Sequence, residues 1–252
     1  MDAQPKRIMF LKVPLDIVAP EDLSEIIESM VRSLAKNETT KKDIVLLSLW
    51  DLLKARRNNE YRNYVLNAAL VIPISKSIVS GVKFLTNKKV VRYMPFNFVV
   101  SLLSILENRE YPLYLLGGKS KVLKKAEKNI HSTFPRLQIV GRCEGYIRKQ
   151  QEPAVVEAIR KASPCLLLAG KGIRGGELWI ARNSRQLNSG FRLWCSDLFD
   201  VLAEKKQRPS DAVFDKGLEG IGFCFARPYK VCRIFSYIRY KILLVFYKLA
   251  GR

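Results

Sequence analysis

Acidic residues are scarce in this sequence of 252 residues. Asp and Glu number 23 against 44 Lys and Arg, which gives a formal net charge of +21 at pH 7. After Phe225 no acidic residue occurs at all. A chain this basic predicts an anionic partner, so a phosphorylated substrate, a nucleic acid and an acidic membrane surface are the classes to consider.

Histidine and paired cysteines are also rare. The five cysteines contain no CxxC pair and are odd in number, so we expect reduced thiols and no disulfide framework. His131 is the only histidine. It comes late in a predicted helix, where its charge suits the helix C-terminus, so we do not expect it to act as a base. Because helix-turn-helix, zinc and single-strand-binding motifs are missing, we do not expect a nucleic-acid partner.

Long apolar runs are missing too. No stretch of about 20 residues is free of charge, so we expect no membrane-spanning helix. The apolar segment at residues 9–11 is interrupted by Lys12 and Pro14, so no secretory signal peptide is predicted. With reduced thiols, these features predict a cytoplasmic protein.

Segments typical of strands alternate with segments typical of helices, which predicts an α/β fold with a parallel sheet covered by helices on both faces. The expected strands are Ile8–Val13, Asp43–Leu49, Ala68–Pro73, Leu113–Leu116, Leu137–Val140, Cys165–Ala169 and Gly190–Cys195. The expected helices are Glu21–Ala35, Asp51–Asn67, Ser75–Leu85, Met94–Leu106, Ser120–Ser132, Glu152–Ala162 and Glu177–Leu187.

Two glycine-rich turns follow predicted strands. Gly117 and Gly118 separate a strand from the helix that begins at Ser120, and residues 170–176 (GKGIRGG) follow another strand. In open parallel sheets, ligands bind where strands end, and amides at a helix N-terminus can hold a diphosphate. A diphosphate or sugar-nucleotide site, a nicotinamide or flavin site and a turn without a ligand are the three interpretations, and we favour the first.

Longer stretches resemble one protein family. They are FLKVPLDIVAPEDL at 10–23, ALVIP at 69–73, YLLGGKSKVLKKAEKNI at 114–130, FPRLQIVGRCEGYI at 134–147, GKGIRGGELWIARNSRQL at 170–187 and LFDVLAEKKQR at 198–208, with GLEG and Arg227-Pro228 near the end. In this order they resemble the WecG/TagA/CpsF glycosyltransferases of bacterial cell-surface polymer synthesis, over nearly the whole chain.

The resemblance implies a Rossmann-like domain over residues 1–208 and a basic, membrane-associating helical appendage over residues 209–252. It also implies transfer of a sugar, N-acetylmannosamine or a related hexose, from a UDP-sugar to a polyprenyl-diphosphate-linked acceptor. Neither a metal nor another cofactor is expected. A homo-oligomer is left open.

The predicted substrate site combines the glycine turns with residues that match the family. We expect Tyr146 to stack on a uracil ring and Asp200 to bond the amide edge of that ring. Arg92 and Arg208 are expected to meet phosphates. The other predicted members lie in the two turns, namely Gly117, Gly118, Gly170, Gly172 and Arg174. The alternatives are core packing for Tyr146, a helix cap for Asp200 and plain surface positions for the arginines.

The family's expected general base is an aspartate directly after the ALVIP strand, but Ile74 stands there. A positioned carboxylate contributes roughly 10²–10⁴-fold, so its loss matters. Glu177 and Asp197 are the candidate replacements, with a solvated carboxylate and a helix N-cap as their respective alternatives. A second interpretation is therefore a catalytically silent homologue that binds a sugar nucleotide or a partner enzyme.

The C-terminal segment 225–252 is predicted to form an amphipathic helix from about Tyr229. We expect it to lie on an anionic bilayer, at the inner face of the cell membrane, and not to cross it. Arg227, Lys230 and Arg233 are expected near the acceptor diphosphate. Three tyrosines are expected at headgroup level, namely Tyr237, Tyr240 and Tyr247. The alternative is packing on the domain or on another subunit, and deletion of the segment is expected to leave a folded domain.

Overall fold

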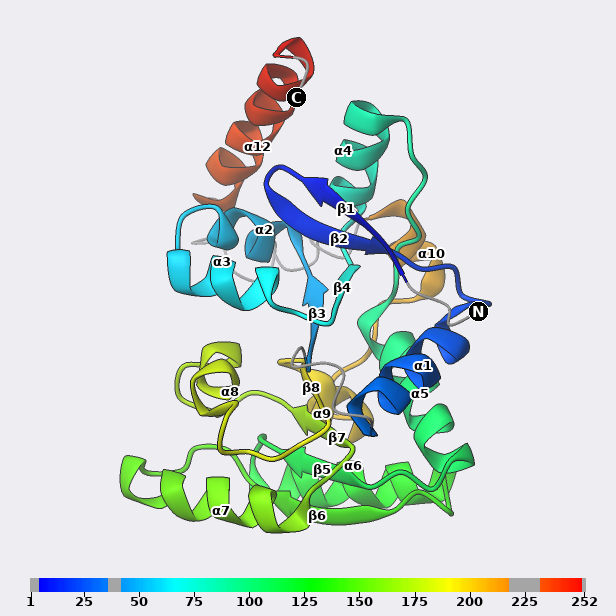
Figure 1. Cartoon of the computed structure of the whole chain (residues 1–252), viewed down its shortest axis with the longest axis vertical. Helices are drawn as coiled ribbons and strands as arrows, with labels where there is room; N and C mark the ends of the chain where they lie inside the picture. Colours follow the sequence, from blue (N-terminus) through cyan, green and yellow to red (C-terminus); the bar gives the residue numbers. More distant parts are fainter. Residues whose placement is uncertain (1–4, 36–41, 218–231, 251–252) are drawn as a thin grey trace.

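A computed structural model describes residues 5–35, 42–217 and 232–250 (Figure 1). Its strands are β1 Lys6–Phe10, β2 Val13–Ile17, β3 Asp43–Leu47, β4 Leu70–Pro73, β5 Leu113–Leu116, β6 Ile139–Cys143, β7 Leu166–Ala169 and β8 Phe191–Trp194. Its α-helices are α1 Leu23–Ala35, α2 Leu49–Ala55, α3 Asn59–Leu66, α4 Lys76–Thr86, α5 Pro95–Asn108, α6 Ser120–Thr133, α7 Glu152–Ala162, α8 Glu177–Asn183, α9 Leu198–Leu202, α10 Asp211–Lys216 and α12 Cys232–Leu249.

Six parallel strands form the central sheet, in the order β4-β3-β8-β7-β5-β6. The strands are short apolar runs that are almost wholly buried, apart from the edge strand β6. Burial on both faces of a sheet favours such continuous apolar runs, which an alternating strand would not provide. The predicted α/β fold is confirmed.

Helices cover both faces of this sheet because successive strand residues point to opposite sides. Ile44, Leu115 and Leu168 belong to one large core with α1, α5, α6 and α9. On the other face, one cluster includes Val45 and lies under α2, α3 and α4, while a second includes Leu167 and lies under α7 and α8. Figure 1 shows these two helix groups at opposite ends of the sheet.

The N-terminal segment differs from the prediction. A single strand over Ile8–Val13 was expected, but β1 and β2 form an antiparallel hairpin outside the main sheet. Leu11 and Lys12 adopt positive φ angles of 49° and 66°, which makes the tight turn that reverses the chain. Buried Asp16 holds the hairpin to the sheet edge by accepting from the Val71 amide at 2.7 Å.

The single long helix expected over residues 51–67 is also wrong, because the structure has two helices there, α2 and α3. Ser48 directly follows β3 and caps α2 by accepting from the Asp51 amide. Asn58 caps α3 by accepting from the Tyr61 amide at 2.8 Å. Such caps satisfy amide groups that a new helix leaves unpaired. The helix expected to reach Leu187 ends earlier, at Asn183.

Helix α12 packs against α4 and the hairpin (Figure 1). Tyr240 is fully buried and donates a hydrogen bond of 2.6 Å to the Ser77 carbonyl, so its expected position at headgroup level is wrong. Leu244 is buried in the same cluster. Tyr240 and Leu244 meet Phe10 beside Gly81, so deleting the tail would remove contacts from this cluster. That the remaining chain folds stays a prediction.

The rest of α12 faces outward. Its exposed apolar side chains are Phe235, Tyr237, Ile238, Ile242, Val245, Phe246 and Leu249. Over the described ranges, no helix combines the length and apolar character needed to cross a membrane. Arg227 and Lys230 lie outside the described residues, and Arg233 lies in α12 without a described side chain.

Candidate functional site

The sheet has a switch point between its neighbouring strands β5 and β7. From β5 the chain continues through α6 to β6 on one side, and from β7 it continues through α8 to β8 on the other. Ligands of open parallel sheets bind in the crevice that such diverging connections leave at the carboxyl ends. The two glycine-rich turns predicted from the sequence therefore lie side by side at this point, and α6 begins there after Lys119, which makes no side-chain capping bond.

Backbone packing explains the glycines at the switch point. A Cβ atom on Gly117 would lie 2.7 Å from the Gly170 carbonyl oxygen, and one on Gly145 would lie 2.9 Å from the Gly172 Cα. The Gly118 amide donates to the Lys171 carbonyl at 2.7 Å. The ends of β5, β6 and β7 are thus joined backbone to backbone. Several of these amides are used between the loops, so the glycines act first by allowing this contact.

Tyr146 adopts a backbone conformation that its side chain disfavours. Its φ is +61° and its side chain is 60% exposed, while its amide donates to the Gly172 carbonyl at 2.6 Å. A Cβ on Gly172 would lie 2.9 Å from the tyrosine ring. A bulky residue in the left-handed region is uncommon and is often associated with a functional site. The exposed ring beside the glycine turn is available to stack on a planar ligand, and core packing is not its role.

Lys171 joins the residues around the switch point. Its ammonium group forms an ion pair with Asp200, which raises the pKa of Lys171, and the charges of Asp197 and Tyr146 act in the same direction. Asp200 is 5% exposed, and its Oδ1 atom has no hydrogen-bond partner among the described residues. A buried acceptor without a donor costs on the order of 1–3 kcal/mol. A ligand N–H group would remove that cost.

Phe199 lies beneath these groups. A Cβ on Gly170 would lie 2.7 Å from the Phe199 ring, and one on Gly118 would lie 3.6 Å from the Phe199 Cβ. The ring is buried, so it fixes the height of both glycine turns above the core. The helix-cap alternative for Asp200 does not apply, since Asp200 is inside α9 and its N-cap residue is Asp197, which makes no side-chain capping bond.

The two predicted bases are held by different lysines. Glu177 accepts from Lys54 of α2 at 2.7 Å, and its side chain is 17% exposed. Asp197 pairs with Lys206 and is 49% exposed. Glu177 thus faces the helix after β3, whereas Asp197 sits after β8. The structure does not bring these two carboxylates into one interaction.

Asp51 is a neighbouring acid that the sequence reasoning missed. It accepts from the Ser48 hydroxyl at 2.5 Å and from the Ser48 amide at 3.1 Å, at the carboxyl end of β3. Burial raises the pKa of Asp51, and the charge of Glu177 raises it further. The spacing of Ser48 and Asp51 is a capping box, which was the available signal.

The end of β4 carries the position where the family resemblance predicts an aspartate. Ile74 packs against the main core, and its carbonyl accepts from Arg92 Nε at 3.0 Å. Arg92 also donates to the Phe214 carbonyl and lies 3.6 Å from the centre of the Phe214 ring. Arg208 donates to Asn97 Oδ1 at 3.0 Å. Arg92 therefore ties β4 to α10.

Arg174 stands apart from these groups. It is exposed in the turn before α8, and no interaction holds it within the described part of the chain. The predicted residues thus form three sets, at the switch point, between α2 and α8, and at the end of β4.

Comparison with known proteins gives one family. Residues 8–252 match the profile of the glycosyl transferase WecG/TagA/CpsF family. A similar protein in Bacillus subtilis strain 168 is named N-acetylglucosaminyldiphosphoundecaprenol N-acetyl-beta-D-mannosaminyltransferase. It is 20% identical over 191 residues, which are 76% of this chain and 74% of the relative. A protein of the same name in Bacillus spizizenii strain W23 is 20% identical over 187 residues, which are 74% and 72% of the two chains.

Proposed function

The chain belongs to the WecG/TagA/CpsF family of glycosyltransferases, and from this premise we propose that it transfers a hexose from a UDP-sugar to a polyprenyl-diphosphate-linked sugar. The donor sugar is N-acetylmannosamine or a close relative, as in the names of the two Bacillus proteins. The observation that carries the proposal is the buried Oδ1 of Asp200 at the switch point, which finds no hydrogen-bond partner in the described part of the chain.

The donor's uracil ring would lie at the switch point. Tyr146 supplies an exposed ring to stack on it, and Asp200 Oδ1 accepts the hydrogen of the uracil N3–H group. Lys171 pairs with Asp200 Oδ2 and so orients the carboxylate. The diphosphate would then lie toward the start of α6, where the helix dipole and the uncapped amides favour negative charge.

The transfer step requires one proton to move. The acceptor hydroxyl attacks the anomeric carbon, a new C–O bond forms, the bond from that carbon to the diphosphate breaks, and UDP leaves. The hydroxyl proton passes to a carboxylate, for which we propose Glu177. Asp51 beside it is the second acid of this set, and Lys54 holds Glu177 in place. Asp197 is the alternative base, after β8.

A silent homologue is the second candidate function. Ile74 cannot accept a proton, and the neighbouring Arg92 donates to the carbonyls of Ile74 and Phe214. In that case the chain would bind a sugar nucleotide, or a partner enzyme, without transferring the sugar.

The exposed side of α12 supports a membrane-facing position, with the helix lying on an anionic bilayer. Its apolar side chains would enter the interface while Lys241 and Lys248 remain at the headgroups. Replacing Phe235 and Ile238 by Ser should weaken binding to anionic vesicles, because neither side chain supports the fold. Unchanged binding would remove α12 from the membrane contact.

The decisive experiment measures UDP release with a panel of UDP-sugars and a short polyprenyl-diphosphate-linked sugar. Calorimetry with UDP and with NAD accompanies it. UDP release with one donor supports transfer, and UDP binding without release supports the silent homologue. Binding of NAD alone contradicts both proposals.

A further inference from the structure

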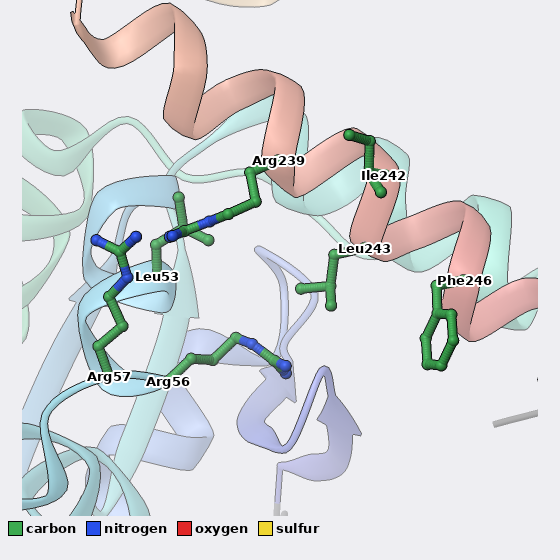
Figure 2. Close-up of a pocket in the computed structure, with 7 residues that line it drawn as sticks. All are labelled: Leu53, Arg56, Arg57, Arg239, Ile242, Leu243 and Phe246. Atoms are coloured by element: carbon green, nitrogen blue, oxygen red, sulfur yellow. The ribbon is translucent and has the colours of Figure 1, made fainter.

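A groove of about 370 Å³ lies between α12 and α2. Figure 2 shows its lining. The residues used below are Leu53, Arg56 and Arg57 of α2 with Arg239, Ile242 and Phe246 of α12. Half of these side chains are cationic and half are apolar, and the lining contains no acid.

Two of the arginines face each other without an anion. Arg57 and Arg239 extend toward one another across the groove in Figure 2, and both are exposed. Neither side chain forms an ion pair or a hydrogen bond within the described ranges. Both side chains are cationic and repel each other, and the lining of the groove contains no acidic side chain that could offset this repulsion. A bound anion would turn this repulsion into attraction for both groups.

The third arginine is fixed in place. Arg56 Nη1 donates to the Leu11 carbonyl at 2.5 Å and to the Tyr247 hydroxyl at 3.3 Å. The guanidinium carbon also lies 5.5 Å from the centre of the Tyr247 ring. The turn of the β1–β2 hairpin therefore orients this side chain before any ligand arrives, which lowers the entropy cost of binding.

The apolar lining identifies the kind of anion. Ile242 and Phe246 are 63% and 61% exposed, and they border the arginines on the α12 side. If inorganic phosphate were bound, these two apolar side chains would remain exposed to water. A ligand with a phosphate and hydrocarbon chains satisfies both parts of the groove, since guanidinium groups bind phosphate oxygens in pairs.

We propose that the groove between α2 and α12 binds the phosphate of an anionic membrane phospholipid, with Arg57 and Arg239 on the phosphate and the acyl chains over Ile242 and Phe246. This goes beyond the proposed function, because it holds whether or not the chain transfers a sugar. It would also connect the membrane to α2, the helix whose Lys54 holds Glu177.

The test uses the full chain and vesicles of phosphatidylcholine with or without phosphatidylglycerol, at one ionic strength. The double variant Arg57→Gln with Arg239→Gln should bind phosphatidylglycerol vesicles at least tenfold more weakly, since each basic residue at such a surface contributes on the order of a fivefold change. The matched control is Arg136→Gln with Arg185→Gln. These exposed arginines precede β6 and β8, outside the groove, and should change binding less than threefold.

A charge-preserving variant separates a site from general attraction. Arg57→Lys with Arg239→Lys keeps both charges but loses paired phosphate contacts, so we expect binding at least threefold weaker than the parent. Inorganic phosphate at millimolar concentration should not displace the vesicles. Parent-like binding by the lysine variant, equal losses in the control pair, or displacement by phosphate would overturn the proposal. Thermal melting checks that all variants fold.

Discussion

The two ends of the sheet's carboxyl edge are built differently. At the β5–β7 end, three loops are joined backbone to backbone, and Oδ1 of the buried Asp200 has no hydrogen-bond partner among the described residues. At the β4 end, Ile74 packs against the core, and Arg92 donates to the carbonyls of Ile74 and Phe214. The β5–β7 end has the features of a binding site. At the β4 end, the side chains contact other parts of the chain.

This difference teaches that binding and chemistry can be separated in one fold. The parts that would hold a uridine nucleotide depend on packed backbone and on one buried charge pair. The part that would take the proton depends on a single side chain, whose replacement leaves the packing intact. A chain can therefore keep its ligand site while its catalytic competence changes.

The largest expected effect comes from restoring a carboxylate at the β4 end. Ile74→Asp places an acid beside Arg92, which offsets its charge, and a positioned base contributes roughly 10²–10⁴-fold to such a transfer. UDP release with the preferred donor should rise accordingly. Ile74→Asn is the matched control without a base. Equal rates for the two variants would show that this end takes no part in the chemistry.

The second prediction concerns the backbone contacts at the β5–β7 end of the sheet. Gly117→Ala puts a Cβ 2.7 Å from the Gly170 carbonyl oxygen at a φ of +122°, so the free energy of unfolding should fall by about 2–5 kcal/mol. Gly118→Ala is the control. At a φ of +71° its nearest contact would be 3.6 Å, so about 1–2 kcal/mol is expected. Urea denaturation measures both, and similar losses would contradict the role of backbone contact.

The third prediction concerns the unpaired oxygen. Asp200→Ala removes the acceptor proposed for the uracil N3–H group, and a hydrogen bond to a charged group is worth about 1.5–3 kcal/mol. The Kd for UDP should therefore rise by about 10- to 100-fold in calorimetry. Glu204→Gln, on an exposed pair with Lys125, should leave it unchanged. A parent-like Kd in Asp200→Ala would place the nucleotide elsewhere.

The smallest expected effect comes from replacing Glu177, in the set of residues between α2 and α8. Glu177→Gln keeps the size of the side chain but cannot take the acceptor's proton, so any sugar transfer should slow by at least tenfold. UDP affinity should stay the same, which distinguishes this variant from Asp200→Ala. Glu157→Gln, on the surface of α7, is the control. Unchanged transfer would leave Asp197 or Asp51 as the base.

The sequence by itself determined the class of the fold and most of the switch point. Apolar runs that alternate with amphipathic segments can be satisfied by a parallel sheet between helices, and glycines after strands mark tight turns. Both signals are local, because they depend on neighbours along the chain. For the same reason Gly117 and Gly170 could be placed after strands in advance. Asp200 was predicted through the family resemblance, and its role stays a prediction.

Only the tertiary structure decided what these residues contact. The contact of Gly117 with Gly170 and the ion pair of Lys171 with Asp200 join segments far apart in the sequence. The distance along the chain likewise hid that Glu177 and Asp197 pair with different lysines. Tyr240 shows the same limit. Its place in an amphipathic helix suggested a lipid contact, but it is buried by packing against Gly81 and Phe10. A hydrophobic pattern shows which face of a helix is apolar. Whether that face packs on protein or on lipid depends on where the rest of the chain lies.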